Sequence, residues 1–204
     1  FDGDKGPNTG GMGTYAPAPV LTDALRDEAM KNILEPMVAA MEKKGMPYVG
    51  CLYAGLMITD EGPKVVEFNA RFGDPETQVV LPLLDSDLGQ IMMACATGTL
   101  TADMVKWKDS SAACVILASK GYPETSSKGD VINGDIKQYD TTIVFHSGTK
   151  LVGENYVTNG GRVLGVVGLG KDLRTALDRA YGRIAHIDFE GMQYRTDIGA
   201  KAFK

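Results

Sequence analysis

The chain contains 204 residues, of which 44% are hydrophobic, and this is sufficient for a buried core in one or two domains. Lysine and arginine number 21 against 26 aspartate and glutamate residues, and the net charge of −5 argues against a broad basic surface for nucleic acid. The sequence has no apolar run of about 18 residues and no signal segment. We therefore expect a cytoplasmic protein with neither a membrane nor a nucleic-acid partner.

The cysteines and the first residue give two further expectations. Cys51, Cys95 and Cys114 are odd in number, widely spaced and set among apolar residues, which is typical of reduced, buried thiols. The chain starts with Phe1 instead of Met and runs directly into a glycine-rich segment. We expect a fragment of a longer protein.

The glycine-rich segment covers residues 3–15 and is predicted to be a loop. Main-chain N–H groups beside glycine can approach an anion closely, but the spacing matches neither the P-loop nor the dinucleotide-binding fingerprint. A purely structural turn is an equal alternative. Residues 16–19 alternate Ala and Pro and should extend the chain away from the loop.

Two helices are predicted in the first half. Thr22 is a suitable N-cap for a helix that runs to about Lys44, because apolar residues recur every three or four positions. Pro36 lies inside this pattern and should kink or split the helix. A second helix is expected over residues 86–96 and should stop at Gly98.

A β-hairpin is predicted between these helices, with strands over residues 48–59 and 64–71. Side chains alternate along a strand, so Glu67, Asn69 and Arg71 would share one face. Two oxygen donors and a guanidinium in line suit a hard cation bound to phosphate. The alternative is a half-buried strand whose polar face meets only water.

The chain becomes polar around residues 101–111, and we place a domain boundary there. The half beyond it is predicted to be α+β. A helix should follow an N-cap at Asp172, because the apolar residues from Leu173 to Ile184 mark one face. Strands are expected over residues 112–119, 130–136, 142–146, 151–157 and 162–168.

Two motifs in this half are not interpreted as sites. Residues 165–171 spell G-x-x-x-x-G-K, but Asp172 stands where the P-loop needs Ser or Thr and would repel phosphate. His146 and His186 are too isolated for a metal site and are expected to be satisfied polar residues.

Several signatures occur together along the chain. The longer ones are Gly-Pro-Asn-Thr-Gly-Gly-Met-Gly at 6–13, Leu-Tyr-Ala-Gly-Leu-Met at 52–57 and Glu-Phe-Asn-Ala-Arg-Phe-Gly-Asp-Pro-Glu-Thr-Gln at 67–78. Shorter ones follow at 120–123, 146–149, 160–164 and 194–199. In this order and spacing they resemble the phosphoribosylamine-glycine ligase family of ATP-grasp enzymes, over nearly the whole chain.

The resemblance implies an α+β fold: the C-terminal half of an ATP-grasp core, an antiparallel sheet with helices, and then a small α+β C-terminal domain. These domains would be residues 1–107 and 108–204. The family joins glycine to 5-phosphoribosylamine through glycyl phosphate, using ATP and releasing glycinamide ribonucleotide, ADP and phosphate in purine biosynthesis. The missing N-terminal half of the same polypeptide would supply most adenine contacts, so the fragment alone is expected to be inactive.

The resemblance also implies roles for individual residues. Glu67 and Asn69 resemble the family's Mg²⁺ (or Mn²⁺) ligands at the ATP phosphates, and Arg71 would stabilise charge on the acyl phosphate. Asp74 would orient either Arg71 or the substrate amine, and both alternatives stay open. The pocket for glycine and phosphoribosylamine would be lined by Asp4, Asn8, Thr9, Gly10 and Gly11. In that pocket Asp4 would attract an amine, while backbone amides would face anionic oxygens.

Arg162 is similar in placement to phosphate-binding arginines in the C-terminal domains of related purine ATP-grasp enzymes. The resemblance implies a contact to the ribose 5-phosphate, and the alternative is an arginine in solvent at the start of a strand. Two other functions remain for the chain as a whole. It could belong to another ATP-grasp carboxylate-amine ligase, or it could be a non-catalytic domain that binds a metabolite or a partner.

Overall fold

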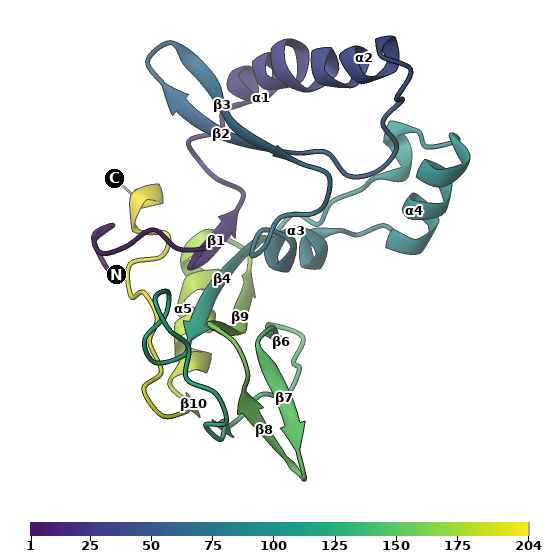
Figure 1. The fold of residues 1–204 in the computed structure, drawn as a ribbon. Coiled ribbons are helices and arrows are strands. Elements are labelled where there is room, and N and C mark those ends of the chain that lie inside the picture. Colours follow the sequence, from purple (N-terminus) through teal and green to yellow (C-terminus); the bar gives the residue numbers. More distant parts are fainter. Residues whose placement is uncertain (204) are drawn as a thin grey trace. The chain divides into compact units, whose positions relative to one another are not determined.

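The computed structural model describes residues 1–203, which divide into two compact units (Figure 1). Unit 1 contains Phe1–Pro17, Asp74–Leu83 and the chain from Lys108 onward. Unit 2 contains Ala18–Gly73 and Leu84–Trp107. Each unit therefore draws on separate stretches of sequence. The expected division into family domains at residues 1–107 and 108–204 stays a prediction.

Unit 1 is built on a four-stranded sheet in which all neighbours are antiparallel. In spatial order its strands are β1 (Gly13–Ala16), β4 (Ser111–Ala118), β9 (Arg162–Gly170) and β6 (Thr142–His146). The prediction that residues 13–15 belong to a loop was wrong. Gly13 pairs with Val115, and the first strand is fixed by this distant partner and not by local sequence.

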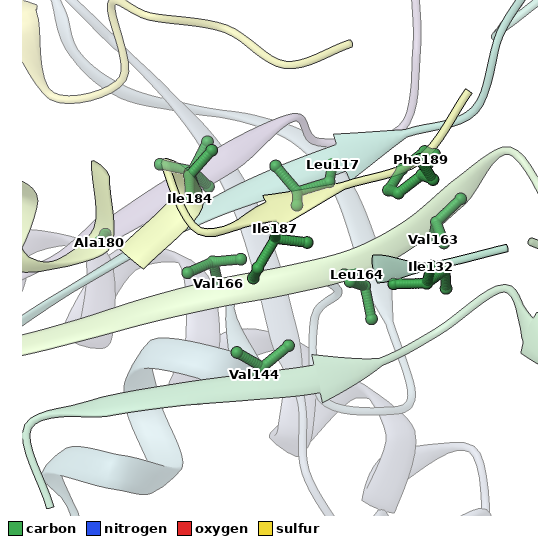
Figure 2. Close-up of a cluster of buried hydrophobic side chains, with 11 residues drawn as sticks. Leu117, Ile132, Val144, Val163, Leu164, Val166, Ala180, Ile184, Ile187 and Phe189 are labelled. Atoms are coloured by element: carbon green, nitrogen blue, oxygen red, sulfur yellow. The ribbon is translucent and has the colours of Figure 1, made fainter. Parts of the chain in front are cut away.

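The core of unit 1 lies on both faces of the central strand β4, every residue of which is buried. Helix α5 (Leu173–Ile184) covers one face, where Val115 and Leu117 belong to the same buried cluster as Ala180 and Ile184 of the helix. Figure 2 shows Leu117, Ala180 and Ile184 of this cluster. Helix α3 (Thr77–Leu83) covers the other face, where Cys114 packs. A strand buried on both sides needs a continuous apolar run, which is what residues 112–118 provide. Burial raises the pKa of the Cys114 thiol to about 12.

The helix α5 confirms the sequence prediction. Asp172 is its N-cap, and the Thr175 amide donates to Asp172 Oδ1 at 2.8 Å. The buried residues of the helix form the predicted stripe: Leu173, Ala176, Leu177, Ala180 and Ile184.

The remaining strands of unit 1 are shorter than predicted. The single strand expected over residues 151–157 was wrong: a turn with Gly153 at φ +59° separates β7 (Thr149–Val152) from β8 (Asn155–Thr158). The strand expected over 130–136 shrinks to β5 (Asn133–Gly134), which pairs with β10 (Ile187–Asp188). A 3₁₀ turn, η3 (Ala200–Phe203), ends the described chain.

Unit 2 contains the predicted hairpin and helices. Its strands are β2 (Tyr53–Thr59) and β3 (Gly62–Asn69). Its helical segments are α1 (Asp23–Ala29), the π-helical η1 (Met30–Leu34), α2 (Glu35–Lys43), α4 (Leu88–Thr97) and the 3₁₀ turn η2 (Ala102–Met104). The second strand ends at Asn69, so Arg71 lies beyond it, contrary to the prediction of a strand through residue 71.

The first helical region confirms the predicted effect of Pro36. Thr22 caps its start, with the Leu25 amide donating to Thr22 Oγ1 at 3.3 Å. Proline has no N–H to donate to the preceding turn, and the turn before Pro36 is widened to the π form over Met30–Leu34.

No helix among the described residues is both long and apolar enough to cross a membrane.

Candidate functional site

Glu67 and Asn69 lie on the same side of β3 and contact each other. The Asn69 side chain donates from Nδ2 to Glu67 Oε1 at 2.9 Å. Glu67 stands opposite Gly55 of β2, where an added Cβ would lie 3.1 Å from Glu67 Cγ. Gly55 therefore leaves room for the glutamate, and the alternation predicted for these two residues is present.

The side-chain oxygens of Glu67 and Asn69 supply some of the ligands that a hard divalent cation needs. A carboxylate and an amide oxygen are ligands that Mg²⁺ accepts, and Mg²⁺ commonly keeps several waters or phosphate oxygens as its other ligands. Among residues 1–203, no group of three or more His, Cys, Asp or Glu gathers as a metal site. An ion held by Glu67 and Asn69 would thus take most of its ligands from water or from a phosphate substrate.

Arg71 follows the strand and is exposed. Its Nη1 donates to the neighbouring main-chain oxygen of Phe72 at 2.9 Å. A guanidinium has five N–H donors, so this bond leaves others for an anionic ligand.

Asp74 and Arg162 form an ion pair within unit 1. Arg162 Nη2 donates to Asp74 Oδ2 at 2.6 Å, and Nη1 donates to the Asp74 main-chain oxygen at 2.9 Å. Gln78 donates from Nε2 to Asp74 Oδ1 at 2.8 Å. Both carboxylate oxygens are thus engaged. The arginine is 22% exposed, so it is not the solvent arginine of the alternative interpretation.

The glycine-rich loop, residues 3–12, packs closely against these residues. Gly10 donates its N–H to the Tyr122 hydroxyl at 3.1 Å, and an added Cβ would lie 3.1 Å from Arg162 Cζ. At Gly11 a Cβ would lie only 2.5 Å from Cδ of Pro75. These glycines are required for close packing. The Gly10 amide faces a phenol oxygen, not the open anion position that the sequence suggested.

Asp4 begins the loop with a left-handed backbone, φ +57°. Its carboxylate pairs with Lys201 Nζ at 2.6 Å and with Arg195 Nη1 at 2.9 Å. Hydrogen bonds from Lys201 and then Arg195 lower the pKa of Asp4. In this structure both carboxylate oxygens of Asp4 are therefore engaged by cations of the chain itself, and the role expected of Asp4 towards a substrate amine stays a prediction.

Asn8 and Thr9 lie with the rest of the loop along an open cavity of unit 1. This cavity is lined by Phe1, Asp4, Lys5, Gly6, Pro7, Asn8, Thr9, Gly10, Gly11, Met12, Gly13 and Arg195. Four of these twelve residues are glycines, and Lys5 and Arg195 are the cationic ones. Such a cavity suits a small polar ligand.

Sequence reasoning missed Arg195, Asp197 and Tyr122. Arg195 binds Asp197 with two bonds of 2.8 Å and so lowers the pKa of that carboxyl, while Asp197 also accepts the Gly3 N–H at 2.8 Å. Two of the short signatures, at 120–123 and 194–199, contain these residues. These signatures could have drawn attention to the three residues, but the sequence alone does not show that they contact the loop.

The two histidines were predicted to be ordinary polar residues. His146 Nδ1 lies 3.0 Å from Thr149 Oγ1, and its ring contacts that of Tyr156. Burial lowers the pKa of His146. The prediction is confirmed for this residue.

Comparison with known proteins gives two family matches. Residues 1–77 match phosphoribosylglycinamide synthetase, ATP-grasp (A) domain, and residues 112–201 match phosphoribosylglycinamide synthetase, C domain. Phosphoribosylamine-glycine ligase of Caulobacter vibrioides is 52% identical over 100% of this chain and 48% of its own length. The trifunctional purine biosynthetic protein adenosine-3 of Gallus gallus is 51% identical over 98% of this chain and 20% of its own length. The chain spans about half the length of the phosphoribosylamine-glycine ligases that it matches.

Solved structures give the same relationship. The crystal structure of phosphoribosylamine-glycine ligase from Thermotoga maritima matches with a TM-score of 0.85 and 35% identity, over 96% of this chain and 48% of that one. The biotin carboxylase domain of Hydrogenobacter thermophilus 2-oxoglutarate carboxylase shares the fold, with a TM-score of 0.63 and 12% identity over 90% of this chain and 40% of its own. The predicted mixture of helices and antiparallel sheet is confirmed. This chain belongs to the phosphoribosylglycinamide synthetase family and has part of the ATP-grasp fold.

Proposed function

We propose that the complete polypeptide carrying this chain is an ATP-dependent ligase that joins glycine to 5-phosphoribosylamine. The products would be glycinamide ribonucleotide, ADP and phosphate, in de novo purine biosynthesis in the cytoplasm. The observation that carries the proposal is the match of both family models, in order, together with a curated ligase 52% identical over the whole chain. The rest of the same polypeptide would complete the ATP site.

The chemistry needs no protein nucleophile. ATP would transfer its γ-phosphoryl group to the glycine carboxylate, and the amine of phosphoribosylamine would then attack the acyl carbon and release phosphate. The protein must therefore neutralise charge and align two small molecules. A bound Mg²⁺ or Mn²⁺ would supply part of this neutralisation.

The residues of this chain would divide the remaining work. Glu67 and Asn69 would hold the ion through oxygen atoms, a role supported by their shared side of β3 and their 2.9 Å contact. Arg71 would use its unengaged N–H groups on the anionic oxygens of the acyl phosphate.

The glycine-rich loop would bind the other two substrates. Asp4 would receive an amine in place of Lys201, and Asn8, Thr9, Gly10 and Gly11 would line the cavity around it, which is supported by the loop lining of that cavity. Arg162 would bind the ribose 5-phosphate with its remaining donors. Asp74 would orient Arg162, because their two bonds fix the guanidinium plane.

The test is substrate omission with the complete polypeptide. ADP release should require ATP, a divalent cation, glycine and phosphoribosylamine together, and the 204-residue chain alone should release none. ADP release with another acid or amine, but not with this pair, would favour a different carboxylate-amine ligase. Binding of the substrates without any turnover by the complete polypeptide would favour the non-catalytic alternative.

A further inference from the structure

Two side chains from the second half of the sequence hold adjacent peptide groups of the glycine-rich loop. The Tyr122 hydroxyl accepts the Gly10 N–H at 3.1 Å. Arg162 Nη1 donates to the Gly11 main-chain oxygen at 3.2 Å. The Gly10–Gly11 segment is therefore held at one N–H group and at one carbonyl oxygen. It belongs to the part of the loop that would meet substrate.

Tyr122 is itself held in place by contacts with Gly161 and Gln193. Its ring lies over Gly161, where an added Cβ would come within 2.2 Å of Tyr122 Cδ2. Its main-chain oxygen accepts a bond from Gln193 Nε2 at 3.1 Å, and the same amide nitrogen lies 2.8 Å from the Ser119 oxygen. The phenol is thus presented to the loop from a fixed ring.

We infer that Tyr122 is a positioning residue that sets the conformation of the loop through the Gly10 amide. Two glycines in succession have little intrinsic preference for one backbone conformation, so the loop needs outside contacts to keep one shape. The Tyr122 hydroxyl accepts the Gly10 N–H through its oxygen and still carries an O–H group. Tyr122 also lines an apolar pocket with Thr9, Met12 and Arg195. These three residues line the loop cavity as well, so Tyr122 lies at its boundary.

The inference rests on the proposed function only for the identity of the substrates. The substitution Tyr122→Phe in the complete polypeptide keeps the ring that packs on Gly161 and removes the hydroxyl alone. The matched control is Tyr156→Phe, because Tyr156 lies on β8 and its ring contacts His146, not the loop.

The expected result is a KM for glycine or for phosphoribosylamine raised about three- to tenfold, the range that one neutral hydrogen bond supports, with the KM for ATP unchanged. Loss of folded protein alone would lower the apparent kcat and leave every KM unchanged. Unchanged KM values for both substrates, or an equal change in Tyr156→Phe, would overturn the inference.

Hydrogen exchange provides a readout that needs no activity. The Gly10 amide should exchange about three- to tenfold faster in Tyr122→Phe, because it loses its acceptor, while amides of β4 stay as protected as in the parent protein. Unaltered exchange at Gly10 would overturn the inference. An inactive parent protein would instead contradict the proposed ligase function, and the exchange experiment would still decide whether Tyr122 holds the loop.

Discussion

Arg162 donates two hydrogen bonds to Asp74, at 2.6 and 2.9 Å, although 88 positions separate the two residues in sequence. A third bond, at 3.2 Å, runs from the same guanidinium to the Gly11 oxygen. One side chain at the start of β9 thus joins the residue before Pro75 to the glycine-rich loop. The close approach is possible because Gly10 has no side chain towards Arg162 and Gly11 has none towards Pro75.

Arg162→Ala should lower the free energy of unfolding by about 1–2 kcal/mol, because one change removes three bonds and leaves two main-chain oxygens without this donor. The expected loss of stability is modest since the Asp74 side chain is 46% exposed and solvent screens the charge. Urea unfolding followed by fluorescence measures the change. Arg162→Lys should lose nearly as much, because an ammonium cannot reproduce the planar fork.

The control for this experiment is Arg26→Ala. Arg26 pairs with Asp23 and Asp27 on an exposed helix, and its side chain is 56% exposed. No measurable loss of stability is expected there. If Arg162→Ala were as mild as Arg26→Ala, the bonds to Asp74 and Gly11 would contribute nothing to folding.

Elements with a local signal were predictable from the sequence. The α5 helix has both a capping aspartate and a complete apolar stripe, and the β2–β3 hairpin has two strand-forming runs around a turn at Asp60 and Glu61. By contrast, β1 has only four residues, and its pairing with β4 spans about a hundred positions. Residues 151–157 suggest one strand because apolar and aromatic residues stand at both ends, and the Gly-Glu-Asn segment between them is only three residues long.

The candidate site divides in the same way. The period of two along β3 brings Glu67 and Asn69 together, and this period can be read from sequence. The partners of the loop cannot be predicted from the sequence, since Tyr122 and Arg195 lie more than a hundred positions away from it. The fold brings them to the loop, since β1 pairs with β4 after the loop and Gln193, near Arg195 in the sequence, bridges to Ala118 at the end of β4.

Gly168→Ala should be among the most damaging small substitutions in unit 1. A Cβ at Gly168 would lie 2.0 Å from the Ala176 main-chain oxygen, which belongs to α5 and cannot move as a side chain could. The helix would have to shift away from β9, at a cost of about 3 kcal/mol. Thermal or urea unfolding would measure this loss.

Gly182→Ala is the matched control, in α5 itself. Apart from the neighbouring residues and the nearby backbone of α5 itself, no heavy atom of the described residues lies within 4 Å of the added Cβ, and alanine is the better helix former. The expected change is a gain of about 0.5–1 kcal/mol. Equal effects from the two substitutions would contradict the close packing of α5 on β9.

Asp135 should contribute to the loss of stability in acid. Hydrogen bonds from Arg183 and then Tyr139 lower the pKa of its carboxyl to about 2, below the ordinary value of 3.8. The folded state therefore favours the charged form, so this contribution is complete above about pH 4 and is lost as the pH falls towards 2. Asp135→Asn should flatten the dependence of unfolding free energy on pH in that window, and acid unfolding of the two proteins followed by fluorescence measures it.

Glu67→Gln should raise the Mg²⁺ concentration needed for half-maximal activity of the complete polypeptide, by roughly tenfold or more, because an anionic ligand becomes neutral. Asn69→Asp should have a smaller effect on Mg²⁺ demand. It keeps an oxygen ligand and adds a negative charge, but it loses the 2.9 Å bond to Glu67 and places two carboxylates side by side.

Glu61→Gln is the control, since Glu61 pairs with Lys64 at the turn of the same hairpin. Mg²⁺ titrations of ADP release compare the three variants, and stability should change by less than about 0.5 kcal/mol in Glu67→Gln and Glu61→Gln, because both positions are exposed on the hairpin. If Glu67→Gln needed no more Mg²⁺ than Glu61→Gln, the ion would have to be held elsewhere, and the polar side of β3 would serve only to meet water.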